Sequence, residues 1–556
     1  MAQQGKGEVV RQGAALPRPA GGRTLLRQQA SGAGTLAPKV ARLPAPAPLD
    51  VAARARRSAL LAALLTLFAA LLVRCAWMSD DAFITLRTVD NAWHGYGLRW
   101  NVDERVQSYT HPLWMLLLLP AYGLAGEGYF STIALSIAVA VAALLVVIAQ
   151  TEGPAWATLA VVLIAGSRAV VDYAACGLEN PLLDLLFAVL AAVVFSEASQ
   201  RRTALLGLLT ALIALTRPDA TLVALPALVH AVATSPRWRR ALATAALGLA
   251  PLAAWEAFSL VYYGSLVSNT AYAKLDVHLP ASALVLQGLR YAADSLVRDP
   301  LTLAVVALGA GLALRRGGRA EAALGAGVLL YLAAVIRIGG DFMSGRFFGG
   351  LLFVCVPLVL RLWPRRRVRF VGALAGLVAL GTLALPRSHW RSGSDYGDAI
   401  ASDAYEHTHG IADERAYYFP ETGLVRVIKG YAKILAYHGP VPPYPGAFNG
   451  LRARAQNATL AVTKETGFFA YFAGPGVHVV DVFALGDPLL ARLPFEPTGA
   501  WRIGHFARPL PEGYKEALRG EGAIRDPRIA ALYERIRLVT RGPLFTAARW
   551  RAMAGL

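Results

Sequence analysis

About 11 apolar runs recur along the first 386 residues, and they constrain the fold more than any other feature of the chain. A helix that crosses the hydrocarbon core of a bilayer needs roughly 20 residues. The runs are 58–76, 131–150, 155–173, 181–196, 203–216, 219–235, 241–262, 301–314, 320–336, 348–363 and 370–386. They predict a polytopic α-helical membrane protein, in which tilt or a thinned bilayer accommodates the shorter runs.

Arginine clusters between the runs predict the orientation of the chain. Arg54, Arg56 and Arg57 precede the first run. Later clusters lie at 201–202, 237–240, 315–319 and 365–369. With 11 crossings every cluster falls on one side, and basic residues favour the cytoplasmic side. The N-terminus is therefore predicted on the cytoplasmic side of the cytoplasmic membrane, and the C-terminal segment on its outer side. The net charge of +19 belongs to these clusters, without the basic face and aromatic platform typical of nucleic-acid binding.

The regions around the runs differ in composition. Residues 1–57 are rich in Ala, Gly, Pro and Arg without periodicity, which predicts a disordered basic cytoplasmic tail. Residues 58–386 form the predicted transmembrane domain, with a first outer loop at 77–112. The proline-containing run 113–125 is short, so we expect it to lie in the interface or to re-enter the membrane.

Residues 387–556 lose the long apolar runs and predict an extracytoplasmic α+β soluble domain. Strand-like runs occupy 460–474 and 477–485, while 526–541 is charged and weakly helical. An acceptor glycan is the expected ligand, because exposed aromatic rings stack on sugars. The candidate rings are Trp390, Tyr396, Tyr444 and Trp501, with ordinary core packing as the alternative.

Six polar, turn-like stretches fall on the side opposite to the arginine clusters. They are SDDAF (79–83), ERVQSYTHP (104–112), CGLENP (176–181), TRPDA (216–220), SNTAYAKL (268–275) and GGDFMSGRFF (339–348). Ionisable residues at membrane depth are unfavourable and usually serve function. We therefore expect a single outer pocket to collect them.

A site on the outer face has no nucleotide to use, and the chain carries neither a GxxxxGK[ST] loop nor a Rossmann GxGxxG motif. A sugar on a polyprenyl phosphate would reach such a site through the membrane. Its transfer to a hydroxyl needs a carboxylate that takes the proton and cations that stabilise the departing phosphate. Asp80 and Asp81 suit the first task, as base or as nucleophile. Arg346 suits the second, with Lys274 as its partner.

The remaining candidates have site roles and simpler alternatives. Asn269, Tyr272 and Asp341 are predicted to bind the donor phosphate or sugar. The predicted supporting residues are Arg87, Tyr109, Thr110, His111, Glu179, Arg217 and Asp219. The alternatives are a solvated helix end for the Asp80–Asp81 pair, a helix cap for Glu179, a structural Arg217–Asp219 pair and an Asp341–Arg346 ion pair.

No cofactor is specified by the sequence. The three cysteines, Cys75, Cys176 and Cys355, lie in or beside apolar runs without a CxxC or Cys/His neighbour. No ligand spacing specifies a metal, although a divalent cation held by Asp80, Asp81 or Asp341 stays open as an alternative.

Taken together, these motifs resemble a known family. DDAF after an apolar run, NAWHGYGLRWNVDERVQSYTHPLW (91–114), CGLENPL, TRPDA, SNTAYAKL and GGDFMSGRFF are similar to motifs of the membrane-integral glycosyltransferases of the C superfamily. The likeness is strongest to the terminal β-(1→2) arabinofuranosyltransferases of actinobacterial cell walls. It extends to VVDVFALGDPLLARLP (479–494) and RIGHFARPLPEGY (502–514).

The resemblance implies a GT-C-like fold, an extracytoplasmic site and decaprenyl-phosphoryl arabinose as the donor. It also implies that the catalytic aspartates of the first loop are Asp80 and Asp81. We therefore expect a membrane-bound glycosyltransferase that moves a sugar, arabinofuranose in this family, from a polyprenyl phosphate to an acceptor glycan. The rival is a transporter or flippase of lipid-linked sugars, which usually shows inverted repeats that this chain lacks. A noncatalytic glycan-binding factor would leave the aspartate pair unexplained.

Overall fold

The computed structural model describes the chain from residue 51 onward, with short gaps. The described residues are 51–275, 277, 279–363, 368–385, 388–393, 395–396, 409–430, 441–495, 497 and 501–556. Residues 55–556 form one compact unit. Most of the predicted disordered tail lies outside the described residues, but helix α1 (Val51–Cys75) begins before the predicted start at residue 58.

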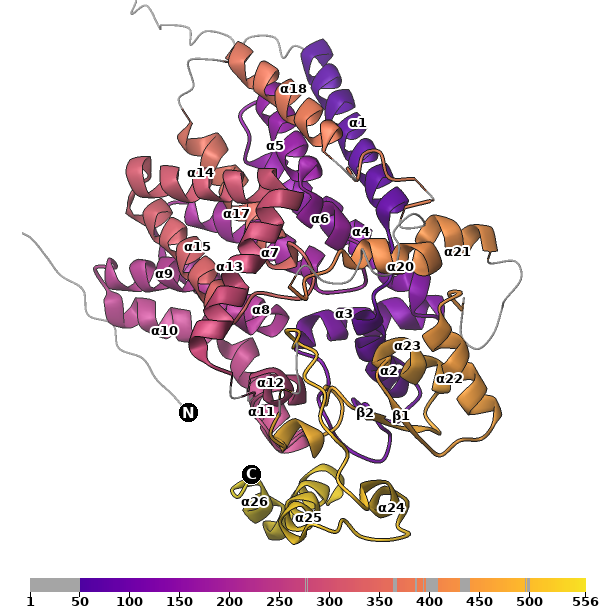
Figure 1. Cartoon of the computed structure of the whole chain (residues 1–556). Helices are drawn as coiled ribbons and strands as arrows, with labels where there is room; N and C mark the ends of the chain where they lie inside the picture. Colours follow the sequence, from indigo (N-terminus) through magenta and orange to yellow (C-terminus); the bar gives the residue numbers. More distant parts are fainter. Residues whose placement is uncertain are drawn as a thin grey trace, which may run out of the picture. The chain divides into compact units, whose positions relative to one another are not determined.

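Each predicted apolar run is helical over most of its length (Figure 1). The helices are α4 (Tyr129–Ala149), α5 (Pro154–Gly166), α6 (Arg168–Tyr173), α7 (Asn180–Val194), α8 (Gln200–Thr216), α9 (Thr221–Ala233), α10 (Trp238–Gly248), α11 (Ala250–Tyr262), α14 (Pro300–Arg316), α15 (Arg319–Arg337), α16 (Arg346–Gly349), α17 (Leu352–Leu362) and α18 (Val368–Ala384). The short run at 113–125 is helix α3 (Pro112–Ala125).

Three described helices are long and apolar enough to cross a membrane: Ala55–Cys75, Tyr129–Ala149 and Arg319–Arg337. The number rises to five if each of two bent helix pairs is one span. The predicted count of about 11 crossings is therefore not confirmed. Several runs are broken into shorter helices, as where Ser167 caps α6 and separates it from α5. Because a helix rises only about 1.5 Å per residue, such short helices span too little length to cross a membrane alone.

Three helices before residue 387 occupy segments that the apolar pattern did not mark, and one of them is the short helix α12 (Asn269–Leu275). Helix α13 (Ala281–Arg298) precedes α14, and helix α2 (Asp80–Trp93) lies in the predicted outer loop. Ser79 caps α2, because its hydroxyl accepts a hydrogen bond from the Ala82 N–H at 3.2 Å. The Ser79 N–H donates to the Cys176 carbonyl at 3.1 Å, so the SDDAF stretch is fixed beside CGLENP.

The C-terminal segment mixes helices with a small parallel sheet. Strand β1 (Leu460–Thr463) pairs with β2 (His478–Asp481). The described helices are α20 (Glu414–Thr422), α21 (Leu424–Gly430), α22 (Pro445–Ala455), α23 (Thr466–Ala473), α24 (Tyr514–Arg519), α25 (Pro527–Arg541) and α26 (Ala547–Met553). The predicted strand 460–474 is thus wrong over α23, because parallel strands need a crossover connection and α23 provides it. The predicted helix at 526–541 is confirmed as α25.

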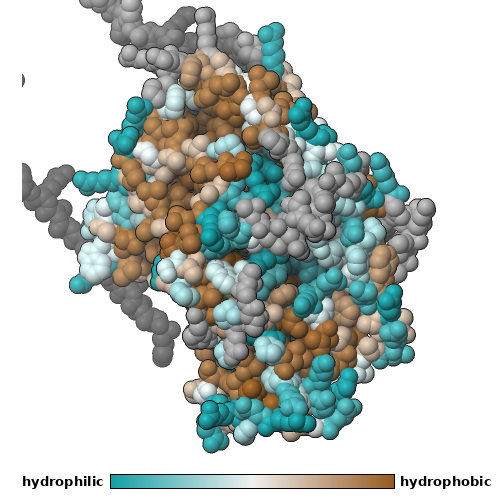
Figure 2. Space-filling view, viewed as in Figure 1, coloured by the Kyte–Doolittle hydropathy of each residue, from teal (hydrophilic) through white to brown (hydrophobic). Residues whose placement is uncertain are grey.

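The C-terminal segment packs against the helical region within the same compact unit. Arg87 on α2 is buried and donates hydrogen bonds to the carbonyls of Ala470 and Val477. The Phe83 ring stacks on Phe468 at 4.2 Å between centroids. Hydrophilic side chains cover much of the lower end, where α24 and α25 lie (Figure 2).

Candidate active site

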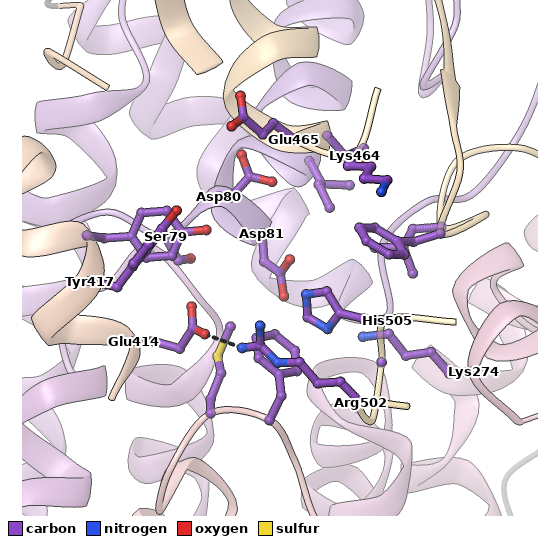
Figure 3. A pocket seen from close by; sticks show the side chains of 18 of the residues that line it. Ser79, Asp80, Asp81, Lys274, Glu414, Tyr417, Lys464, Glu465, Arg502 and His505 are labelled. Carbon is purple, nitrogen blue, oxygen red and sulfur yellow. Dashed lines mark hydrogen bonds and ion pairs between the residues drawn. The ribbon is translucent and has the colours of Figure 1, made fainter. Parts of the chain in front are cut away.

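An open cavity of about 200 Å³ lies where the start of α2 meets the C-terminal segment. Its walls come from α2, helix α12 (Asn269–Leu275), α20, the β1–α23 connection and the loop after residue 501 (Figure 3). The titratable residues that line it are Asp80, Asp81, Lys274, Glu414, Tyr417, Tyr418, Tyr444, Lys464, Glu465, Arg502 and His505. Three of the six predicted stretches, SDDAF, SNTAYAKL and GGDFMSGRFF, line this cavity, whereas the stretches at 104–112, 176–181 and 216–220 do not. Twelve of the 19 lining residues come from the segment after residue 387.

Asp81 projects toward the middle of this cavity (Figure 3). It lies in the first turn of α2, where the helix dipole favours a carboxylate. No described residue forms a hydrogen bond or an ion pair with its carboxylate. Both oxygens are therefore available to a substrate proton or to an electrophilic carbon.

Asp80 has a different role, because its carboxylate caps helix α23. One oxygen accepts the Gly467 N–H at 2.9 Å and the other accepts the Phe468 N–H at 2.8 Å. Glu465, the residue before α23, makes no side-chain cap of its own. A Cβ at Gly467 would lie 1.8 Å from the Asp80 carbonyl oxygen, so only glycine permits this approach. The solvated-helix-end alternative is wrong for Asp80.

Burial raises the pKa of Asp80 to about 7, from an ordinary value of 3.8. The two backbone N–H groups oppose this shift, and the neighbouring Asp81 carboxylate adds to it. The folded protein therefore holds this proton more tightly than the unfolded chain does. The resulting contribution to stability is full below about pH 4 and is lost as the pH rises to about 7.

Replacing Asp80 with Asn should change how stability depends on pH. Asn keeps one carbonyl acceptor but turns an amide N–H₂ toward the second backbone donor, so the variant should be less stable at pH 5. Because Asn does not ionise, wild type should lose stability relative to the variant between pH 5 and pH 8, with most of the loss below pH 7. Melting temperatures in detergent at pH 5, 6, 7 and 8 would check this. A difference that is constant across the series would contradict it.

Cationic groups lie around the Asp81 carboxylate. No described residue pairs with the ammonium of Lys274 or of Lys464. Arg502 donates a hydrogen bond to Glu414 at 2.7 Å. His505 meets the ring of Phe342 edge-on, with 4.5 Å between ring centroids. Lys274 therefore fits the predicted binding of an anion, and two cations that the sequence did not single out, Lys464 and Arg502, line the cavity with it.

Arg346 is not among the residues that line the cavity. Its guanidinium donates to both carboxylate oxygens of Glu179, at 2.9 and 3.2 Å, and to the Asn180 side-chain oxygen at 3.3 Å. The third guanidinium nitrogen lies 3.5 Å from the Asp341 carboxylate. The structure thus contains the Asp341–Arg346 ion pair that was the alternative to substrate contact.

Glu179 is the centre of a buried network that joins four of the polar stretches. Its carboxylate also lies 3.2 Å from His111 Nδ1 and 3.9 Å from Arg217. Glu179 occupies the N-cap position of α7, as the helix-cap alternative expected, but its side chain makes no capping hydrogen bond there. The structural Arg217–Asp219 pair is confirmed at 2.7 Å, and Thr110 is partly buried beside His111.

Three further candidates hold the scaffold together. The Asn269 amide donates to the backbone carbonyls of Ala484, Leu485 and Asp487. The Arg492 guanidinium covers the Tyr272 ring at 4.4 Å. The Tyr109 hydroxyl is 2.9 Å from that of Tyr263. None of the three lines the cavity, so their described contacts are structural.

The four candidate sugar-stacking rings have different surroundings. Tyr444 lines the cavity. Tyr396 is buried and its hydroxyl donates to Asp413 at 2.9 Å. Trp390 donates to the Thr382 hydroxyl at 3.2 Å, and Trp501 is partly buried. Only Tyr444 is therefore placed to meet a ligand in this cavity.

Among the described residues, no group of three or more His, Cys, Asp or Glu side chains is placed to hold a metal ion. Asp341 pairs with Arg346 and does not line the cavity with Asp80 and Asp81. The predicted divalent-cation alternative therefore has no three-residue cluster in this part of the chain.

Comparison with known proteins shows what the chain is similar to. No family model matches it. A terminal β-(1→2)-arabinofuranosyltransferase of Mycobacterium tuberculosis is 30% identical over 410 residues, which are 62% of this chain and 63% of that protein. The corresponding enzyme of Corynebacterium glutamicum is 30% identical over 317 residues, 49% of this chain and 46% of that protein. The chain is homologous to these arabinofuranosyltransferases. The resemblance drawn from the motifs is thereby confirmed, and the chain spans less than two thirds of the length of either relative.

Among solved structures, the arabinofuranosyltransferase AftD from mycobacteria matches 61% of this chain and 28% of its own, at 17% identity. The TM-score of 0.27 is too low to assign a common fold.

Proposed function

We propose that this protein transfers an arabinofuranosyl unit from a polyprenyl-phosphate donor to a hydroxyl of an acceptor glycan, on the outer face of the cytoplasmic membrane. The observation that carries the proposal is the Asp81 carboxylate, which pairs with no described residue and faces a cavity that also holds the Lys274 ammonium. The homology to terminal arabinofuranosyltransferases supports arabinose as the sugar.

Asp81 can serve this transfer in either of two ways. As a base, it takes the proton of the acceptor hydroxyl while the acceptor oxygen bonds to the anomeric carbon and the phosphate leaves with the bonding electron pair. As a nucleophile, it bonds to the anomeric carbon while the phosphate leaves with the bonding electron pair. The acceptor oxygen then displaces the carboxylate, which leaves with its electron pair, and the acceptor proton passes to the released phosphate. A β-linked donor and a β-linked product require retention of configuration, which favours the second route or attack from the same face.

The cations stabilise the charge that develops on the leaving phosphate. Lys274 comes from α12 and Lys464 from the segment before α23, so they approach the cavity from different elements. Glu414 holds the Arg502 guanidinium in place through a hydrogen bond. The phosphate site proposed here therefore contains Lys274 from the predicted set, whereas Arg346 supports the scaffold.

The acceptor sugar would meet the tyrosine-bearing side of the cavity. Tyr417 and Tyr418 lie on α20, and Tyr444 precedes α22. Aromatic rings offer a flat apolar face to sugars, and their hydroxyls offer hydrogen bonds. Tyr417 is 45% exposed, which leaves its ring accessible for stacking.

The direct test uses purified protein in lipid nanodiscs with polyprenyl-phosphoryl [¹⁴C]arabinose and an arabinan oligosaccharide. Label should appear in the acceptor, and its mass and linkage identify the product. Transfer only from other polyprenyl-phosphate sugars would overturn arabinose as the sugar. Absence of transfer from every such donor, together with movement of labelled donor across proteoliposomes, would favour the transporter.

Replacing Lys274 with Met should raise the KM for the donor roughly tenfold or more, because a hydrogen bond to a charged group contributes about 1.5–3 kcal/mol. The melting temperature should stay near that of wild type, since the Lys274 ammonium has no partner among the described residues. Lys515→Met, on exposed α24, is the matched control. An unchanged donor KM in Lys274→Met would remove this residue from the phosphate site.

A further inference from the structure

Helix α13 (Ala281–Arg298) buries polar side chains and exposes apolar ones, the reverse of a helix on the surface of a water-soluble protein. Its buried residues are Gln287, Gly288, Tyr291 and Ser295. Its exposed large apolar residues are Leu286 (50%), Leu289 (51%), Leu296 (50%) and Val297 (81%). Members of the exposed set lie three, seven and eight residues apart, so they form one stripe along the helix.

The polar side of α13 is fixed against the protein. The Gln287 amide donates to the His409 carbonyl at 2.7 Å. The Tyr291 hydroxyl donates to the Met343 carbonyl at 3.1 Å and accepts the Phe347 N–H at the same distance. A Cβ at Gly288 would lie 2.1 Å from a carbonyl oxygen of α15, so the helices touch there. These contacts prevent α13 from rotating its apolar stripe inward.

The connection to the next helix sets the direction of α13. Helix α14 begins after Asp299 and is bent from α13 by 110°, which is 20° beyond a right angle. If α14 runs along the membrane normal, α13 lies about 20° from the membrane plane. Arg290 is exposed beside the stripe, as is usual for a helix at a lipid headgroup layer. Hydrophobic side chains gather over the region of α13, α14 and α15 (Figure 2).

We propose that α13 lies on the membrane surface, with Leu286, Leu289, Leu296 and Val297 in the boundary between headgroups and acyl chains. A lipid surface removes this stripe from water and leaves the inward polar contacts intact, and the exposed Arg290 beside the stripe suits a headgroup layer. The inference stands on α13 itself and does not depend on the transferase reaction.

The placement bears on the cavity. Tyr291 and Asp294 of α13 hold the loop before α16, through hydrogen bonds with Met343 and Ser344. Phe342 and Met343 of that loop line the cavity. The cavity thus lies at the level of the membrane surface, where the phosphate of a lipid-linked substrate is found.

Nitroxide accessibility tests this placement. Single cysteines at Leu289, Leu296 and Val297 would be spin-labelled in nanodisc-bound protein, with Lys515→Cys on exposed α24 as the aqueous control. The native Cys75, Cys176 and Cys355 are buried, so the added thiols should be the labelled ones. The protein without added cysteines gives the background, and elution profiles confirm that each labelled variant is folded.

The three α13 labels should collide more with molecular oxygen, which partitions into lipid, than with a water-soluble nickel chelate. The ratio of the two collision rates should be several-fold higher than at Lys515. Ratios equal to that at Lys515 would place α13 in water and overturn the proposal. Protection from both reagents would also overturn it, because a second copy or another protein would then cover the stripe.

Discussion

Replacing Asp81 with Asn is expected to lower arabinosyl transfer by roughly 10²- to 10⁴-fold, the range for loss of a positioned base, and by more for loss of a nucleophile. Asn cannot accept the hydroxyl proton at neutral pH, and its amide is a poor nucleophile. The substitution preserves the shape of the side chain. No described residue bonds to the Asp81 carboxylate, so the melting temperature should remain within about 2 °C of wild type.

Asp80→Asn is the matched control, because it makes the same chemical change one residue earlier. Asp80 caps α23 through two backbone N–H groups, so this variant should be less stable than wild type at pH 5 while keeping part of its turnover. Initial rates with labelled donor and melting curves for both variants give the comparison. If Asp80→Asn were inactive but fully stable, and Asp81→Asn active, the assignment of catalytic and capping roles would be reversed.

The helices and the position of the aspartate pair follow from local sequence, and for this reason they could be predicted. Apolar composition identifies a helix wherever it falls, and Ser79 before Asp80 and Asp81 is a recognisable helix start. The number of crossings depends on how short helices are arranged, as in the 48° bend between α10 and α11. Such bends depend on packing between helices, which composition does not encode.

The distinction between Asp80 and Asp81 could not be predicted, because it depends on residues almost 400 positions away. The partners of Asp80 are the Gly467 and Phe468 backbone N–H groups, which α23 brings to α2. His505 and Arg502 reach the cavity in the same way. Their RIGHF stretch contributed to the family resemblance, but nothing in its local spacing indicates a cavity wall.

Arg346 illustrates the same limit for charge pairs. Its position in GGDFMSGRFF, five residues after Asp341, indicated an Asp341 pair or a phosphate ligand. The structure adds Glu179, whose carboxylate accepts two hydrogen bonds from the guanidinium. Sequence spacing detects partners within a few residues, whereas this partner is 167 positions away.

Replacing Arg346 with Ala should therefore lower the free energy of unfolding, with a smaller effect on the KM for the donor. Glu179 is buried, and removal of one partner from a buried ion pair typically costs about 3–5 kcal/mol. His111 and Arg217 also approach the Glu179 carboxylate, which should keep the loss toward the lower end of that range. Heat or denaturant unfolding in detergent, followed by loss of the monodisperse protein, measures the change.

The double variant Arg346→Met with Glu179→Leu separates the two roles of the pair. Because the double variant removes both charges of this pair, no Glu179 carboxylate remains without the Arg346 guanidinium. Stability should therefore recover relative to Arg346→Ala. Double-mutant cycles on the free energy of unfolding should then give a large coupling energy between Arg346 and Glu179. The coupling energy between Arg346 and Lys274 should be near zero. A stable Arg346→Ala protein with a raised donor KM would instead place Arg346 on the phosphate, and Lys274→Met would then add little to its effect.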